Sequence, residues 1–131
     1  MKTSIVLAAV GLSLACTPAL AQVRNCPAGQ QWVVARVSKI TGTQAGFDDA
    51  VHDHIKWYRD HGYKANTIIT GPVMERSDKG EPTASKDMVL SLHLDDPGVP
   101  PEKYDDAWRA YVAKYRANSQ IVSETSGCLP K

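Results

Sequence analysis

Hydrophobic and polar residues alternate along Asp87–Leu94, where every second position is Met or Leu. This two-residue period is typical of a strand, because successive side chains point to opposite faces of a sheet. Three other segments are rich in β-branched residues and are bounded by Gly, Pro or polar turns. The four predicted strands are Gln31–Lys39, Tyr63–Glu75, Asp87–Leu94 and Gln120–Thr125. Pro72 has no amide hydrogen to donate, so we expect Tyr63–Glu75 to be an edge or bulged strand.

Two further segments repeat apolar residues every three or four positions, which predicts helices that bury one face. The first runs from about Gln44 to His61, after a capping Thr43 and before Gly62. Its predicted buried face carries Phe47, Val51, His54, Tyr58 and His61. The second opens at Pro100-Pro101-Glu102 and presents an aromatic stripe. The stripe consists of Tyr104, Trp108, Tyr111 and Tyr115. We interpret it as a helix face packed on the sheet, and a platform that binds aromatic rings is the alternative.

The order strand, helix, strand, strand, helix, strand predicts a ferredoxin-like α+β sandwich with both helices on one face. Right-handed crossovers give the antiparallel sheet order 4-1-3-2, with strands numbered along the chain. The fourth strand then lies beside the first. Cys26 precedes the first strand and Cys128 follows the fourth, so both fall at the same end of neighbouring strands. We therefore predict a disulfide bond between them, as is common in proteins of oxidising compartments.

The first 21 residues have the features of a secretory signal peptide rather than of a folded segment. Ile5–Ala15 is an apolar run too short to span a bilayer with ease, and Ala19-Leu20-Ala21 is a small-x-small cleavage site. We expect cleavage after Ala21, a single domain over residues 22–131, and a periplasmic or secreted bacterial protein. Lipidation at Cys16 is the alternative. No other apolar run approaches spanning length, so no membrane span is predicted.

The charge balance bears on the partners of the protein. The chain has 15 Lys and Arg against 14 Asp and Glu, a net charge of +1. Removing the predicted signal peptide takes Lys2 and leaves 14 of each sign. A dedicated nucleic-acid binder needs a concentrated basic surface, so this class is not expected. The same balance gives no indication of a membrane surface or an acidic substrate as partner.

Two helices cover only one sheet face, and the composition of the other face suggests an interface. Depending on register, we assign to the uncovered face Val89, Ser91 and His93 together with several of Trp32, Val34 and Arg36. That face is too apolar to remain in water comfortably. A homodimer formed through the open sheet face is therefore predicted.

At the level of element order, length and the segment His54–Tyr63 (HIKWYRDHGY), the chain resembles the dimeric α+β barrel superfamily. This superfamily contains antibiotic-biosynthesis-monooxygenase-like and haem-degrading proteins. The resemblance covers about Gln31–Thr125 and implies a ligand between helices and sheet. Haem-degrading members use an Asn on the first strand, a Trp and a His. The first strand here has no Asn, so haem chemistry is not expected and no cofactor is predicted.

The candidate catalytic residues are His54 and His93. His54 lies on the predicted buried helix face beside Tyr58, where it is either a hydrogen-bonded core residue or a base or ligand donor in a cavity. His93, near Asp95, is either a base with its orienting carboxylate or a polar residue of the interface. His54, Tyr58 and His93 are the candidate ligand-binding residues.

Sequence motifs narrow the function no further. There is no HExxH, CxxC, GxSxG, P-loop or dinucleotide fingerprint. His54 and His61 share a helix face but lie two turns apart, about 10 Å by helix rise, so no metal site is predicted. The first hypothesis is a dimeric module that binds a small molecule or an envelope protein. The alternative is a cofactor-independent, monooxygenase-like enzyme with His54 or His93 as base.

Overall fold

The computed structural model describes residues 24–131. The predicted signal peptide lies outside the described residues, so cleavage after Ala21 and lipidation at Cys16 remain predictions. The elements are β1 Gln30–Ile40, α1 Gln44–Asp60, β2 Thr67–Arg76, β3 Pro82–Leu94, the 3₁₀ turn η1 Pro101–Lys103, α2 Asp106–Asn118 and β4 Ser119–Pro130. Neither helix in the described part of the chain is long and apolar enough to cross a membrane.

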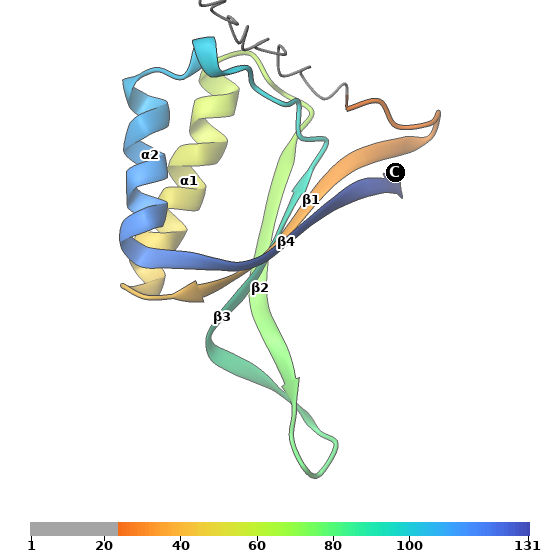
Figure 1. Ribbon diagram of the computed structural model, residues 1–131, viewed down its shortest axis with the longest axis vertical. Helices are drawn as coiled ribbons and strands as arrows, with labels where there is room; N and C mark the ends of the chain where they lie inside the picture. Colours follow the sequence, from red (N-terminus) through yellow and green to blue (C-terminus); the bar gives the residue numbers. More distant parts are fainter. Residues whose placement is uncertain (1–23) are drawn as a thin grey trace, which may run out of the picture.

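The four strands form one antiparallel sheet in the order β2-β3-β1-β4, and both helices cover the same face (Figure 1). This is the predicted order 4-1-3-2 counted from the other edge, so the predicted ferredoxin-like α+β fold is confirmed. In the centre of the sheet, Arg36 of β1 lies opposite Ser91 of β3 and Glu124 of β4. Directly opposed residues share a sheet face, so these three side chains point to the same side.

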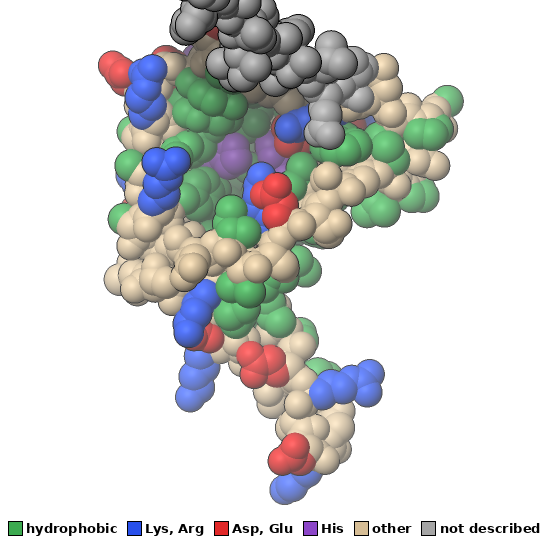
Figure 2. Space-filling model, in the orientation of Figure 1, with side chains coloured by type: hydrophobic (Ala, Val, Ile, Leu, Met, Phe, Trp, Pro, Cys, Tyr) green, Lys and Arg blue, Asp and Glu red, His purple; other side chains and the backbone are tan. Residues whose placement is uncertain are grey.

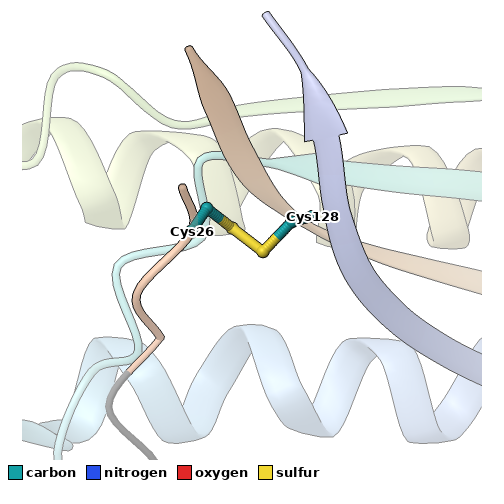
Figure 3. The surroundings of a disulfide bond; sticks show 2 residues. All are labelled: Cys26 and Cys128. Carbon is teal, nitrogen blue, oxygen red and sulfur yellow. A yellow bond between two sulfur atoms is a disulfide. The ribbon is translucent and has the colours of Figure 1, made fainter. Parts of the chain in front are cut away.

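The predicted disulfide bond between Cys26 and Cys128 is present (Figure 3). Its two Cα atoms are 5.6 Å apart, and it joins the segment before β1 to the end of β4. The pairing follows from the sheet order, because β4 runs antiparallel beside β1 and brings Cys128 opposite Trp32. Such a bond is typical of proteins that fold in an oxidising compartment.

The helix boundaries follow local capping. The Thr43 hydroxyl accepts a hydrogen bond from the Gly46 amide at the start of α1, and Gly62 has a left-handed φ of 82° just after its end. The second helix begins later than predicted. Its cap is Asp105, whose carboxylate accepts from the Trp108 amide, while the prolines at 100 and 101 introduce the separate turn η1.

β1 extends one residue beyond the prediction at each end, and the other three strands differ from it by more. β2 begins only at Thr67, because the Arg59 guanidinium holds the Tyr63 and Asn66 carbonyls in a turn after α1. β3 begins at Pro82, and its hairpin with β2 projects beyond the rest of the sheet (Figure 1). β4 continues to Pro130 along β1. As predicted from Pro72, β2 is an edge strand with an irregular register beside that proline.

The two sheet faces are the reverse of our assignment. Ser91 and His93, together with Arg36, face the helices, and His93 is buried against Tyr58 of α1. Leu90, which alternates with them in β3, instead lies on the uncovered face and is 39% exposed. Polarity alone suggested the opposite arrangement, because leucines usually point toward the covered side. The covered side here contains a polar-floored cavity, and the apolar alternate residues are left outside.

Candidate functional site

A cavity of about 520 Å³ lies between the helices and the sheet. In Figure 2, histidine side chains lie at the bottom of a hollow, with hydrophobic side chains around them and basic and acidic side chains nearby. The sheet supplies a polar floor, and the helices supply largely aromatic walls. The floor residues are Arg36 and Ser38 of β1, Ile68 of β2, Ser91 and His93 of β3, and Ile121 of β4.

The predicted aromatic stripe forms one wall, with Tyr104 just before α2 and its other three residues on the helix. Tyr104, Trp108, Tyr111 and Tyr115 all line the cavity. Tyr104 stacks on Trp108 with ring centroids 4.1 Å apart, and Tyr111 is 2% exposed. Both predicted features of the stripe are therefore present, because its rings pack α2 onto its neighbours and also expose ring surface to the cavity.

His54 lies on the α1 wall, as its helical phase predicts. Its ring stacks on Tyr111 at 4.5 Å, and Nδ1 lies 3.3 Å from the Tyr115 hydroxyl. Nε2 makes no hydrogen bond with any of residues 24–131. Burial, and then the neighbouring His93 and Arg36, lower the pKa of His54 from 6.5 to about 3, so the ring is neutral. A neutral ring with one free nitrogen can accept a proton or a hydrogen bond, or donate one, according to its tautomer.

His93, on the floor, has a different environment. Its Nε2 lies 3.0 Å from Nδ2 of Asn66. The Asn66 oxygen Oδ1 accepts a hydrogen bond from Arg59, which can only donate, so the NH₂ group must face His93. Nε2 of His93 is therefore the acceptor, and the proton of the neutral ring is on Nδ1. Burial is the main cause that lowers the pKa of His93 to about 4, which keeps the ring in this neutral form.

The carboxylate beside His93 is Asp96, which corrects our expectation of Asp95. Oδ2 of Asp96 lies 3.9 Å from Nδ1 of His93 and also forms an ion pair with Arg24. Asp95 has a left-handed φ of 51° and points to Lys131 instead. The turn at the end of β3 therefore sends the two consecutive carboxylates in different directions, and His93 has both nitrogens directed at protein groups.

Tyr58 and Tyr111 complete the polar groups of the helix side. Tyr58 packs against both histidines, with ring centroids 5.1 Å from His54 and 5.2 Å from His93. Burial raises the pKa of both tyrosines, so their hydroxyls stay protonated. The Tyr111 hydroxyl is buried and has no hydrogen-bond partner among residues 24–131. Native structures rarely leave such a group unsatisfied, and functional sites are among the places where they do.

The structure thus brings all three sequence candidates, His54, Tyr58 and His93, to one cavity. Sequence reasoning missed the contributions of Arg24 and Asp96. Asp96, which stands before Pro97 and Gly98, was interpreted as a turn residue. Arg24 precedes every predicted element, so no pattern placed it in the fold. The available signal for these two was the disulfide: once Cys26 is fixed beside β4, Arg24 is held near the end of β3.

Comparisons with known proteins leave the family open. No known family's sequence model matches the chain, and no curated protein sequence matches it. Among solved structures, the chain is similar to SnoaB, a cofactor-independent oxygenase from Streptomyces nogalater. The TM-score is 0.47 at 11% sequence identity, and the match covers 79% of this chain and 94% of that one.

Proposed function

We propose that this protein binds a small, partly aromatic molecule in the cavity between its helices and sheet. The carrying observation is the cavity itself: about 520 Å³, with aromatic walls and a few polar groups on the floor. Ligand sites typically enclose about 300–1,000 Å³ and combine mainly apolar walls with a small number of placed polar groups. His54, Tyr58 and His93 are the proposed ligand-contacting residues.

The test uses a neutral bicyclic probe, 2-naphthamide, and follows chemical shifts of the α2 ring protons by NMR. We expect saturable binding that perturbs Trp108 and Tyr115. Ser91→Leu fills the floor of the cavity and should weaken binding at least tenfold. Ser77→Leu, in the exposed turn between β2 and β3, is the matched control and should leave binding unchanged. Equal binding to both variants, or no binding to the parent protein, would contradict the proposal.

The second candidate function is a cofactor-independent oxygenase in which His54 removes a proton from the bound molecule. It is favoured by the contrast between the histidines: His54 has a free Nε2, whereas both His93 nitrogens face protein groups. A CH₂ group would lose two hydrogens and become a carbonyl, with one atom of O₂ entering the product and the other leaving as water. A base with a pKa near 3 takes a proton poorly, so the reaction needs a ligand that raises this pKa.

We further propose a homodimer formed through the open sheet face, in keeping with the resemblance to dimeric α+β barrels. Leu90 and Ile69 are 39% and 51% exposed on strands β3 and β2. Sedimentation at micromolar concentration should give twice the monomer mass, and Leu90→Lys should return the monomer. A parent protein that sediments as a monomer would contradict the dimer and the barrel, and only the sandwich fold of the single chain would stand.

A further inference from the structure

The floor of the cavity carries a cation whose hydrogen-bonding capacity is mostly unused. Arg36 lies at the centre of β1, is 32% exposed, and lines the cavity beside Ser91. Its Nε donates to Oε2 of Glu124 at 2.5 Å. Neither Nη group makes a hydrogen bond with any of residues 24–131. A guanidinium has five N–H groups, so four of them remain for another acceptor.

The acidic side chains of the described residues around the cavity leave the Nη groups of Arg36 without a partner. Asp96 is the one carboxylate among the described lining residues, and it is already paired with Arg24 at the end of β3. Glu124 faces Arg36 from the edge strand β4, but it is 49% exposed and contacts Nε alone. Arg116 adds a third positive charge to the lining and is exposed. The described lining therefore has more positive than negative charge.

Resting on the proposed function, we infer that the ligand of this cavity carries a carboxylate or similar planar anionic group, which Arg36 binds through its Nη groups. A guanidinium and a carboxylate match in a two-pronged geometry that fixes orientation as well as adding attraction. The apolar part of the ligand would lie between Tyr111, Trp108 and the sheet. The ligand class is therefore an aromatic or otherwise unsaturated acid of small size.

An anion at this position would also act on His54. Arg36 is one of the groups that lower the pKa of His54, and burial is the largest. A bound anion offsets the positive charge of Arg36 and favours the protonated ring. The same ligand group would thus fix the orientation of the molecule and make His54 a better proton acceptor.

The experiment compares 2-naphthoate with 2-naphthamide, which have the same ring system and differ in charge. At pH 7.5, isothermal titration should show at least tenfold tighter binding of 2-naphthoate to the parent protein. Arg36→Gln should weaken 2-naphthoate at least tenfold and leave 2-naphthamide within twofold, which also shows that the variant is folded. Glu124→Gln releases Arg36 from its partner and should tighten 2-naphthoate.

Matched controls locate the anion site. Arg76→Gln removes an exposed charge at the end of β2 that does not line the cavity, and it should change neither probe by more than twofold. Loss of 2-naphthoate binding in Arg24→Gln or Arg116→Gln but not in Arg36→Gln would overturn the assignment to Arg36. Equal affinities of the two probes for the parent protein would overturn the anionic ligand class but keep the cavity. Failure of both probes to bind would reject the proposed function itself.

Discussion

Two clusters of side chains, one where the end of α1 meets the start of α2 and one between these helices and β1, differ in how completely their polar atoms are paired. In the closed cluster, formed by Trp57, His61 and Asp105, every ring nitrogen has a partner. Trp57 Nε1 donates to Asp105 Oδ1 at 2.8 Å, and the His61 nitrogens lie 2.8 Å from the Trp57 carbonyl and 2.9 Å from Asp105 Oδ2. In the cavity cluster, formed by His54, Tyr111 and Arg36, polar atoms are left without partners among residues 24–131.

The difference assigns stability to the closed cluster and, under the proposed function, ligand binding to the cavity cluster. In the closed cluster, Asp105 also caps α2 through the Trp108 amide, and this hydrogen bond is the main cause that lowers the pKa of the Asp105 carboxyl. This hydrogen-bond network links the end of α1 to the start of α2. The cavity cluster leaves polar atoms unpaired, and for the buried Tyr111 hydroxyl this reduces stability unless a ligand supplies a partner. The presence of histidine beside aromatic rings does not distinguish the two clusters, whereas their hydrogen-bond pairing does.

The largest expected effect comes from removing the disulfide, which tethers Arg24 to the cavity side of the molecule. The cysteines are 102 positions apart in the sequence, and the double variant Cys26→Ser/Cys128→Ser should lose about 2–5 kcal/mol of unfolding free energy. A urea melt measures this loss. Hydrogen exchange should show faster opening of β4 and the end of β3 than of α1 around Trp57. Faster opening of α1 first would reverse the assignment of stability to the closed cluster.

Acid should act on the cavity through its two neutral histidines, His54 and His93. The unfolded chain binds protons near pH 6.5, whereas folded His54 and His93 bind them only near pH 3 and 4. The stability they contribute is thus present above about pH 6.5 and is lost as the pH falls, by at most about 1.4 kcal/mol per unit for each histidine. Urea melts between pH 7 and 5, above the usual carboxyl range, measure the slope. His54→Asn and His93→Asn should each reduce the slope of the unfolding free energy against pH. An unchanged slope in both variants would mean that other groups take up the protons.

A crossed pair of variants compares the clusters directly. Trp57→Phe removes the donor to Asp105 and part of a ring stacked 3.9 Å from His61, so it should lower stability by about 1–3 kcal/mol. The affinity for 2-naphthamide should stay within twofold of the parent. His54→Gln should do the reverse, with less than about 1 kcal/mol lost and at least tenfold weaker binding. A result in which His54→Gln costs as much stability as Trp57→Phe would make His54 a structural residue.

The smallest expected effect is that of the Tyr111 hydroxyl. Because this group has no partner among the described residues, Tyr111→Phe should leave stability unchanged or raise it by up to about 1 kcal/mol. The control is Tyr104→Phe, which removes a hydroxyl that donates to the Val99 carbonyl and should lose about 0.5–1.5 kcal/mol. Thermal melts of the two variants side by side check the contrast. Similar losses in both would mean that the Tyr111 hydroxyl has a partner.

The sequence predicted the topology well, because it depends on features that are local or covalent. Element order limits the sheet to a few arrangements, and Cys26 with Cys128 supports one of them. The prediction of which face of β3 the helices cover was wrong for a physical reason. Leu90 is more apolar than Ser91, and a rule that buries the apolar side cannot anticipate a cavity that needs polar groups inside.

The site was predicted in part. The helical period placed His54 and Tyr58 on the correct face of α1, since side chains three or four positions apart share a face. The pairing of Asp96 with Arg24 depends on the left-handed turn at Asp95 and on the tethered segment before β1. Contacts between residues so far apart in the chain leave no periodic signal.

The bond between Cys26 and Cys128 also determines how the molecule would respond to mechanical tension. It joins two points that lie close to residues 24 and 131, at one end of a pair of antiparallel strands. Force applied through both ends of this region would pass from Cys26 to Cys128 through the covalent bond. The sheet, the helices and the cavity would carry almost none of the load, and the region could be inserted in a stretched assembly without being unfolded by it.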